Sequence, residues 1–129
     1  IVYRDDGNSG HGTAIVGTVS GTSISFGSEV VFEAAETKFA TVSYDTNAQK
    51  VLVTYQDEGG SNYGTAIVGT VDPSDNSISF GSPVIYKSAA VSDQASVYDP
   101  DSQKIVIAFS LSQPQAAVAT ISGTSVSFG

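Results

Sequence analysis

The chain has 129 residues, of which 40% are hydrophobic and only 14% are charged, and its formal net charge is −8. This length suits a single domain, and so acidic a surface repels phosphate, which argues against nucleic acid and anionic membranes as partners. Cysteine is absent and histidine occurs once, so disulfides, thiolate metal sites and two-histidine metal sites are excluded. No apolar run reaches the length of a membrane-spanning helix, and we expect no membrane insertion.

The chain repeats itself. The segment GTAIVGTV occurs at Gly12–Val19 and again at Gly64–Val71, and SISFGS occurs at Ser23–Ser28 and at Ser77–Ser82. A third, more divergent version occupies Gln115–Gly129. A period of about 50 residues indicates a repeat architecture rather than one irregular domain.

Each copy carries four strand signals, which the second copy shows most clearly. Phe39–Tyr44 is followed by a polar turn and by Lys50–Tyr55, whose apolar residues alternate. Thr65–Val71 is a nearly continuous apolar run, and Ser77–Tyr86 completes the set. Gly81 and its neighbour Ser82 interrupt this last strand, so a bulge or kink is expected there. No segment has a helical period, and the sequence therefore predicts an all-β fold.

Four strands in a repeat of about 50 residues are typical of a β-propeller blade. The chain then divides into a partial blade at residues 1–32 without its first strand, a complete blade at 33–86, and a nearly complete blade at 87–129 that is cut in its last strand. The missing initial methionine and the ends within strands favour a segment of a longer protein over several copies assembled into a ring. A β-trefoil or β-prism is the alternative fold, because three four-stranded repeats also fit this length.

The propeller reading makes specific predictions about packing. Val16 and Val68, which occupy equivalent positions, are expected to be buried between neighbouring blades. Aromatic residues that recur at strand ends are expected in the core: Tyr44, Tyr55, Tyr98 and Phe109. Two lysines are expected to form exposed pairs with the aspartates that open the preceding turn: Lys50 with Asp45, and Lys104 with Asp99.

Three segments resemble known repeats: GTAIVGTVSGTSISFGS (Gly12–Ser28), YDTNAQKVLVTYQDEGG (Tyr44–Gly60) and YDPDSQKIVIAF (Tyr98–Phe109). They resemble propeller-type repeats that occur in tandem in large proteins of marine bacteria and their phages, including tail-fibre-like and adhesin-like chains. The resemblance covers nearly the whole chain. It implies an extracellular or virion-surface location, and partners among further blades of the same chain or other copies of it. It implies no particular activity, and the tryptophan-containing Asp-box of sialidases is missing.

Candidate binding residues lie in the connections between the second and third strands, because long polar loops on a rigid scaffold are where ligands usually bind. The first such loop contributes Arg4, Asp5, Asp6, Asn8 and His11, and the second contributes Asp57, Glu58, Asn62 and Tyr63. The third, Ser110–Gln115, is shorter and uncharged and is expected to bind poorly. The connections Glu33–Lys38 and Lys87–Gln94 are predicted to be further loops on the same face.

Each of these features has a structural alternative. The acidic pairs Asp5-Asp6 and Asp57-Glu58 could receive sugar hydroxyls or a calcium ion, or they could cap backbone amides in turns. A ring at His11 or Tyr63 could stack on a sugar or pack against the neighbouring blade. The chain is expected to be a noncatalytic recognition module without a cofactor, which binds a glycan or a cell-surface receptor. The alternatives are a structural spacer, or the scaffold of a polysaccharide-active enzyme whose catalytic residues lie elsewhere.

Overall fold

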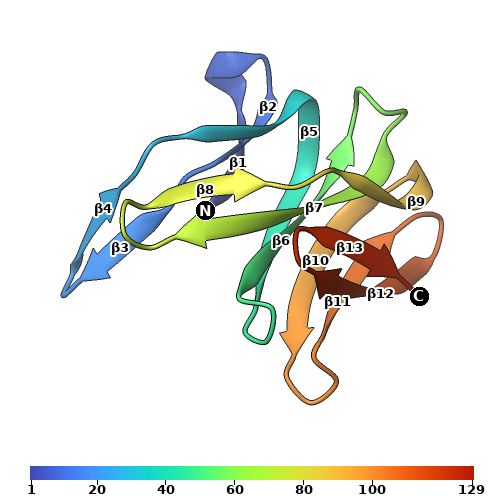
Figure 1. The fold of residues 1–129 in the computed structure, drawn as a ribbon. Coiled ribbons are helices and arrows are strands. Elements are labelled where there is room, and N and C mark those ends of the chain that lie inside the picture. The colour runs from blue at the N-terminus through green and yellow to red at the C-terminus, as the bar shows by residue number, and fades with distance from the viewer.

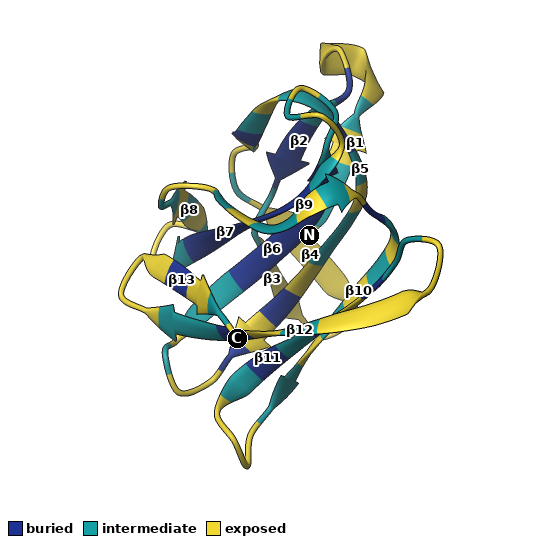
Figure 2. Cartoon of the chain, turned by 90° about the vertical axis from the view of Figure 1, so that its right-hand side faces the viewer, coloured by how far each residue is buried: buried dark blue, intermediate teal, exposed yellow.

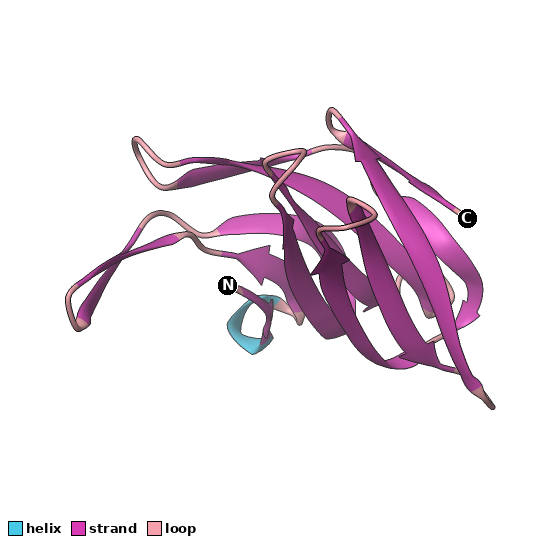
Figure 3. Ribbon diagram, turned by 90° about the horizontal axis from the view of Figure 1, so that it is seen from below, coloured by secondary structure: helices cyan, strands magenta, loops and turns pink.

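The computed structural model describes residues 1–129 and confirms the all-β prediction. It contains thirteen strands and a single turn of 3-10 helix, η1, which lies near the N-terminus (Figure 3). No helix in the structure is long and apolar enough to cross a membrane.

The strands fall into three successive units. The first unit contains β1 (Val2–Asp5), η1 (Asp6–Asn8), β2 (His11–Ala14), β3 (Gly17–Ser20), β4 (Ser23–Phe26) and the first half of β5 (Val30–Asp45). The second unit contains the second half of β5 with β6 (Lys50–Asp57), β7 (Tyr63–Asp72), β8 (Ser77–Phe80) and β9 (Val84–Ala90). The third unit contains β10 (Ser92–Asp99), β11 (Lys104–Ser110), β12 (Pro114–Ser122) and β13 (Ser125–Phe128).

All paired strands are antiparallel. The strands β1, β2, β5, β6, β7 and β8 follow one another in one sheet, with β9 paired to the first half of β7. The strands β10–β13 form a second sheet, and β3 and β4 form a separate two-stranded ribbon. Because β5 pairs with β2 and then with β6, the larger sheet curls (Figure 1). The two sheets meet where β10 lies beside β5, and there the hydroxyl oxygens of Ser43 and Ser96 are 2.7 Å apart.

The predicted loops at Glu33–Lys38 and Lys87–Gln94 are wrong, since both segments are almost entirely strand. β5 runs through the first without a break, and only Val91 separates β9 from β10 in the second. Each segment keeps its hydrogen bonds by changing partners: β5 leaves β2 after Glu36 and joins β6 at Thr37. The strand thus serves two units, and it crosses the boundary that the sequence suggested between residues 32 and 33.

The expected interruption of the fourth strand is confirmed. β8 ends at Phe80 and β9 begins at Val84, and both pair with β7. A side chain at Gly81 would collide with the backbone carbonyl of Thr124 in the third unit. Glycine at this kink therefore permits close contact between the second and third units.

Two hydrophobic clusters lie between successive units and use equivalent residues. The first joins Ala14 and Phe32 of the first unit to Val53, Tyr55 and Ile67 of the second. The second cluster is larger, and its buried members are Leu52, Ala66, Val68, Val91, Ile105, Ile107, Phe109, Ala119 and Val126. The second unit is therefore covered on both faces, and much of β6 and β7 is buried (Figure 2).

The core predictions hold in part. Tyr55 is fully buried and Phe109 is 5% exposed, as predicted, but Tyr44 is 52% exposed. Val68 is fully buried, whereas its equivalent Val16 is only half-buried. Both exceptions have one cause: the first unit has no strand equivalent to the second half of β5, so the residues that such a strand would cover stay open.

Candidate functional site

The two predicted binding loops close in the same way. In the first, the Asp5 carboxylate accepts a hydrogen bond from the Gly7 amide at 3.0 Å, and its carbonyl accepts one from Gly10 at 2.8 Å. In the second, the Asp57 carboxylate accepts from the Gly60 amide at 2.9 Å, and its carbonyl accepts from Asn62 at 2.8 Å. Both aspartates therefore hold their own loops in shape.

Each loop is also tied to the junction between two units. The Gly10 carbonyl accepts a hydrogen bond from the Thr37 amide at 3.0 Å, and the equivalent Asn62 carbonyl accepts one from the Val91 amide at 3.2 Å. In the second unit the Gln56 side chain adds a bond to the Val91 carbonyl, with nitrogen and oxygen 2.6 Å apart. Equivalent backbone hydrogen bonds thus fix both loops to the unit junctions.

The charged residues of this edge pair with one another. Arg4 places Nε 2.7 Å from Asp6 Oδ1 and a terminal nitrogen 2.8 Å from Glu36 Oε1. Lys38 pairs with Glu58, and this bond lowers the pKa of the Glu58 carboxyl below its ordinary value. Because Glu36 and Lys38 both belong to β5, the pairs bring the two predicted loops together along one edge of the sheet.

The remaining predicted residues differ in how free they are. Asn8 and Asn62 are exposed, and the Asp6 side chain is 81% exposed despite its bond to Arg4. His11 and Tyr63 are half-buried and stand opposite Glu36 and Ala90 in the strand pairing. Five side chains at this edge can still receive a ligand: Asp6, Asn8, His11, Asn62 and Tyr63.

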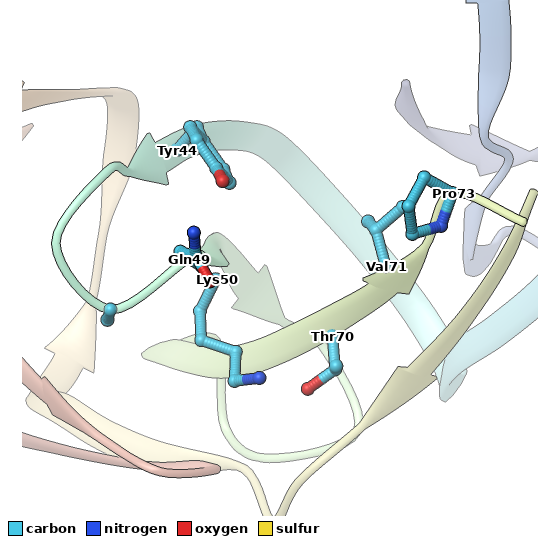
Figure 4. Close-up of a pocket in the computed structure, with 7 residues that line it drawn as sticks. Tyr44, Gln49, Lys50, Thr70, Val71 and Pro73 are labelled. Carbon is cyan, nitrogen blue, oxygen red and sulfur yellow. The ribbon is translucent and has the colours of Figure 1, made fainter.

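A second candidate site lies in a cavity of about 560 Å³ beside the β5–β6 and β7–β8 turns. Its walls are Tyr44 with Gln49 on one side and Val71 with Pro73 on the other, and Lys50 and Thr70 lie between them (Figure 4). Ala48 also lines it. Tyr44 as a whole residue is 52% exposed. The cavity therefore combines an open aromatic face with an ammonium, an amide and a hydroxyl group.

The predicted ion pairs of Lys50 with Asp45 and of Lys104 with Asp99 are wrong. None of the three ion pairs in the structure includes either lysine. The Asp45 carboxylate instead accepts hydrogen bonds from the Asn47 and Ala48 amides, both at 2.9 Å. The Asp99 carboxylate accepts bonds from Asp101 and Ser102, which lower the pKa of its carboxyl. The Lys50 ammonium consequently remains available inside the cavity.

The third unit repeats this set of residues without the cavity. Tyr98, Gln103, Lys104 and Thr120 occupy the positions of Tyr44, Gln49, Lys50 and Thr70 in the strand register. Pro73 has no equivalent, because the β12–β13 turn is shorter, and the structure has no cavity at that place. The pairs Tyr-Asp and Gln-Lys, repeated on either side of a turn, were the signal in the sequence that could have pointed to this site.

No three His, Asp or Glu side chains come together as a group that could hold a metal ion. No protein-family model matches the chain, and no curated protein or solved structure matches it.

Proposed function

We propose that the chain is a noncatalytic recognition module that binds glycans, with the Tyr44 cavity as its principal site. An exposed tyrosine ring can stack on the apolar face of a sugar, while Lys50, Gln49 and Thr70 offer hydrogen-bonding groups to hydroxyls. A cavity with an aromatic wall and a few convergent polar groups is the usual form of a small-ligand site. The ring of Tyr44 at the mouth of this cavity is the observation that carries the proposal.

We further propose that the three units are successive blades of a β-propeller. Two observations support this: β5 pairs with β2 of the first unit and then with β6 of the second, and equivalent clusters fill both junctions. Radial repetition of four-stranded sheets is the propeller pattern. A trefoil would require a three-fold arrangement that this succession of units does not favour. The proposed setting is an extracellular or virion surface, where weak repeated sites gain by avidity.

The loop edge is proposed as a second, weaker contact region. Its available groups are Asn8, His11, Asn62 and Tyr63, together with Asp6, which remains 81% exposed beside Arg4. The geometry of this edge is fixed by the repeated hydrogen bonds to the unit junctions. Because Asp5, Asp57, Arg4 and Glu58 are occupied in internal bonds, this edge has fewer free groups than the sequence suggested.

Glycan-array binding with matched variants tests the proposal. Tyr44→Ala and Lys50→Gln are expected to reduce binding at least tenfold, which corresponds to about 1.4 kcal/mol. Lys104→Gln removes an equivalent lysine where there is no cavity and is expected to leave binding unchanged. A double Asn8→Ala, Asn62→Ala variant is expected to have a smaller effect.

The other outcomes assign other functions. Binding that responds only to the asparagine variant would place the site at the loop edge. If the folded wild-type chain binds no glycan, a structural spacer is favoured. The charges at the loop edge would then serve only to tie the loops to β5. Release of reducing sugar from a polysaccharide would contradict the noncatalytic assignment.

A further inference from the structure

Each junction between units is built from two kinds of face. We call the side of a unit that packs on the next unit its forward face, and the side that packs on the preceding unit its rear face. At the second junction the forward face of the second unit contributes Leu52, Ala66 and Val68, which are all fully buried. The rear face of the third unit contributes Ile107 and Phe109, which are 0% and 5% exposed. The repeat therefore shows what each face contacts.

The rear face of the first unit is open. The repeat places Ile1 where the second unit has Val53, and Ile1 is 64% exposed while Val53 is fully buried. Ile24 and Phe26 are 53% and 52% exposed in the β3–β4 ribbon. Strand pairing and alternation place six residues on this face: Ile1, Tyr3, Ile15, Val19, Ile24 and Phe26.

The forward face of the third unit is open as well. The repeat places Val118 where the second unit has Val68, and Val118 is 42% exposed while Val68 is fully buried. Val97 lies on β10, which is separated from β12 by β11 in the same sheet, and is 62% exposed. Strand pairing places six uncharged residues on this face: Ala95, Val97, Val106, Ala108, Ala116 and Val118. Exposed stretches of β10 and β12 appear in Figure 2.

We propose that the chain associates head to tail with a second copy, with the forward face of the third unit of one copy packed on the rear face of the first unit of the next. The two open faces correspond to the pair that forms both internal junctions. The apolar side chains named on the two faces form contiguous exposed patches, and such patches mark interaction sites. Charged groups border them: the Ile1 ammonium and the Glu29 carboxylate at the rear face, and Asp99 and Lys104 at one end of the forward face. The new contact thus continues the packing already present between the units.

This contact is heterologous, because the two faces are different. A heterologous contact produces a ring where the rotation between copies closes and an open chain where it does not. An open assembly of any length retains one forward face at one end and one rear face at the other, so the mean mass of the assembly rises with protein concentration.

Two variants that block opposite faces test the proposal. Ile24→Asp places a charge on the rear face, and Val118→Asp places one on the forward face; both positions are solvent-exposed, so folding is expected to persist. In sedimentation velocity the wild-type chain is expected to form oligomers larger than a dimer. Each variant alone is expected to sediment as a monomer. An equimolar mixture of the two is expected to form a heterodimer, because each variant retains the face that the other has lost.

Ile85→Asp is the matched control, since Ile85 is 51% exposed but lies on the middle unit, outside both faces. It is expected to oligomerise as the wild type does, and circular dichroism with thermal melts checks the fold of all variants. A wild-type chain that stays monomeric at every concentration would overturn the proposal and leave these faces to some other occupant. Dimerisation by either single variant would also overturn the proposal, because two like faces would then be pairing. Failure of the mixture to associate would overturn it as well, because the two remaining unlike faces would then not be pairing.

Discussion

The ring of Phe32 packs against the ring of Tyr55 with centroids 5.2 Å apart and planes at 57°. Phe32 belongs to the first unit and Tyr55 to the second, so the contact spans their junction. The next junction repeats it: the rings of Tyr86 and Phe109 are also 5.2 Å apart, with planes at 63°. Each ring of the earlier unit also meets a second phenylalanine, Phe80 at 5.6 Å and Phe128 at 5.8 Å. Three aromatic rings therefore anchor each junction.

Removal of one of these rings is expected to be costly. Phe109→Ala should lower the free energy of unfolding by about 3–5 kcal/mol, because it leaves a cavity in the larger cluster. Ile85→Ala, at an exposed position, should change it by less than about 0.5 kcal/mol. Urea denaturation followed by tyrosine fluorescence and circular dichroism gives both values. A loss below about 1 kcal/mol for Phe109→Ala would contradict the packing described here.

A glycine near the start of β2 and of β7 makes room for the aromatic ring that its own unit contributes to the next junction. A Cβ at Gly64 would lie 2.6 Å from the Tyr86 ring, and one at Gly12 would lie 2.5 Å from the Phe32 ring. Gly64→Ala is expected to destabilise the fold by about 1–3 kcal/mol through overpacking. Tyr86→Leu in the same chain should recover part of that loss, and a double-mutant cycle measures the coupling. Strictly additive effects would show that the two residues do not compete for space.

Substitutions at the equivalent positions Gln56 and Arg4 are expected to lower the free energy of unfolding by different amounts. Gln56 is 8% exposed and its side-chain amide bonds to the Val91 carbonyl, so Gln56→Ala should cost about 1–3 kcal/mol. The equivalent Arg4 has a side chain that is 40% exposed, so Arg4→Ala should cost at most about 1 kcal/mol. Denaturant midpoints of the two variants compare them directly. A larger loss for Arg4→Ala would reverse this assignment.

Acid should weaken the link between the second predicted loop and β5. The bond to Lys38 lowers the folded-state pKa of the Glu58 carboxyl below its ordinary value of 4.5. Since the folded pKa is the lower one, this stabilisation is present above pH 4.5 and is lost as the pH falls through the folded value. Lys38→Met should therefore make stability less dependent on pH in this acid range, while Lys87→Met should not. Urea midpoints measured across the range provide the check.

Strand positions were predictable because strand alternation and turn chemistry are local. The segment predicted at Lys50–Tyr55 is β6, which extends two residues further to Asp57, and the segment at Thr65–Val71 lies within β7. The interruption at Gly81 was predictable for the same reason. The strand β5, which two units share, could not be predicted in this way. Its segment Glu33–Lys38 is polar in sequence and becomes extended only by pairing with β2 on one side and β6 on the other.

The candidate sites were less predictable than the strands. Sequence spacing put Lys50 near Asp45 but could not decide between the ammonium and the backbone amides of Asn47 and Ala48, which lie closer along the chain. Repetition also suggested that Tyr44 and Tyr98 share one environment. Burial depends on the preceding unit, which covers Tyr98 more fully than Tyr44. The cavity combines this exposure of Tyr44 with the longer β7–β8 turn that carries Pro73.

The unbroken course of β5 restricts how the length of this chain can change. Side chains alternate between the two faces of a strand, so a one-residue insertion turns every later side chain of that strand to the opposite face. Hairpin turns can absorb such a change, and the longer β7–β8 turn of the second copy is an example of added length outside the strands. Between Glu33 and Lys38 no turn is present to do so, and only the register shifts of β5 against β2 and β6 can take up an added residue. Growth or loss of residues at the boundary between copies is therefore confined to these bulges, and whole copies are the natural increment.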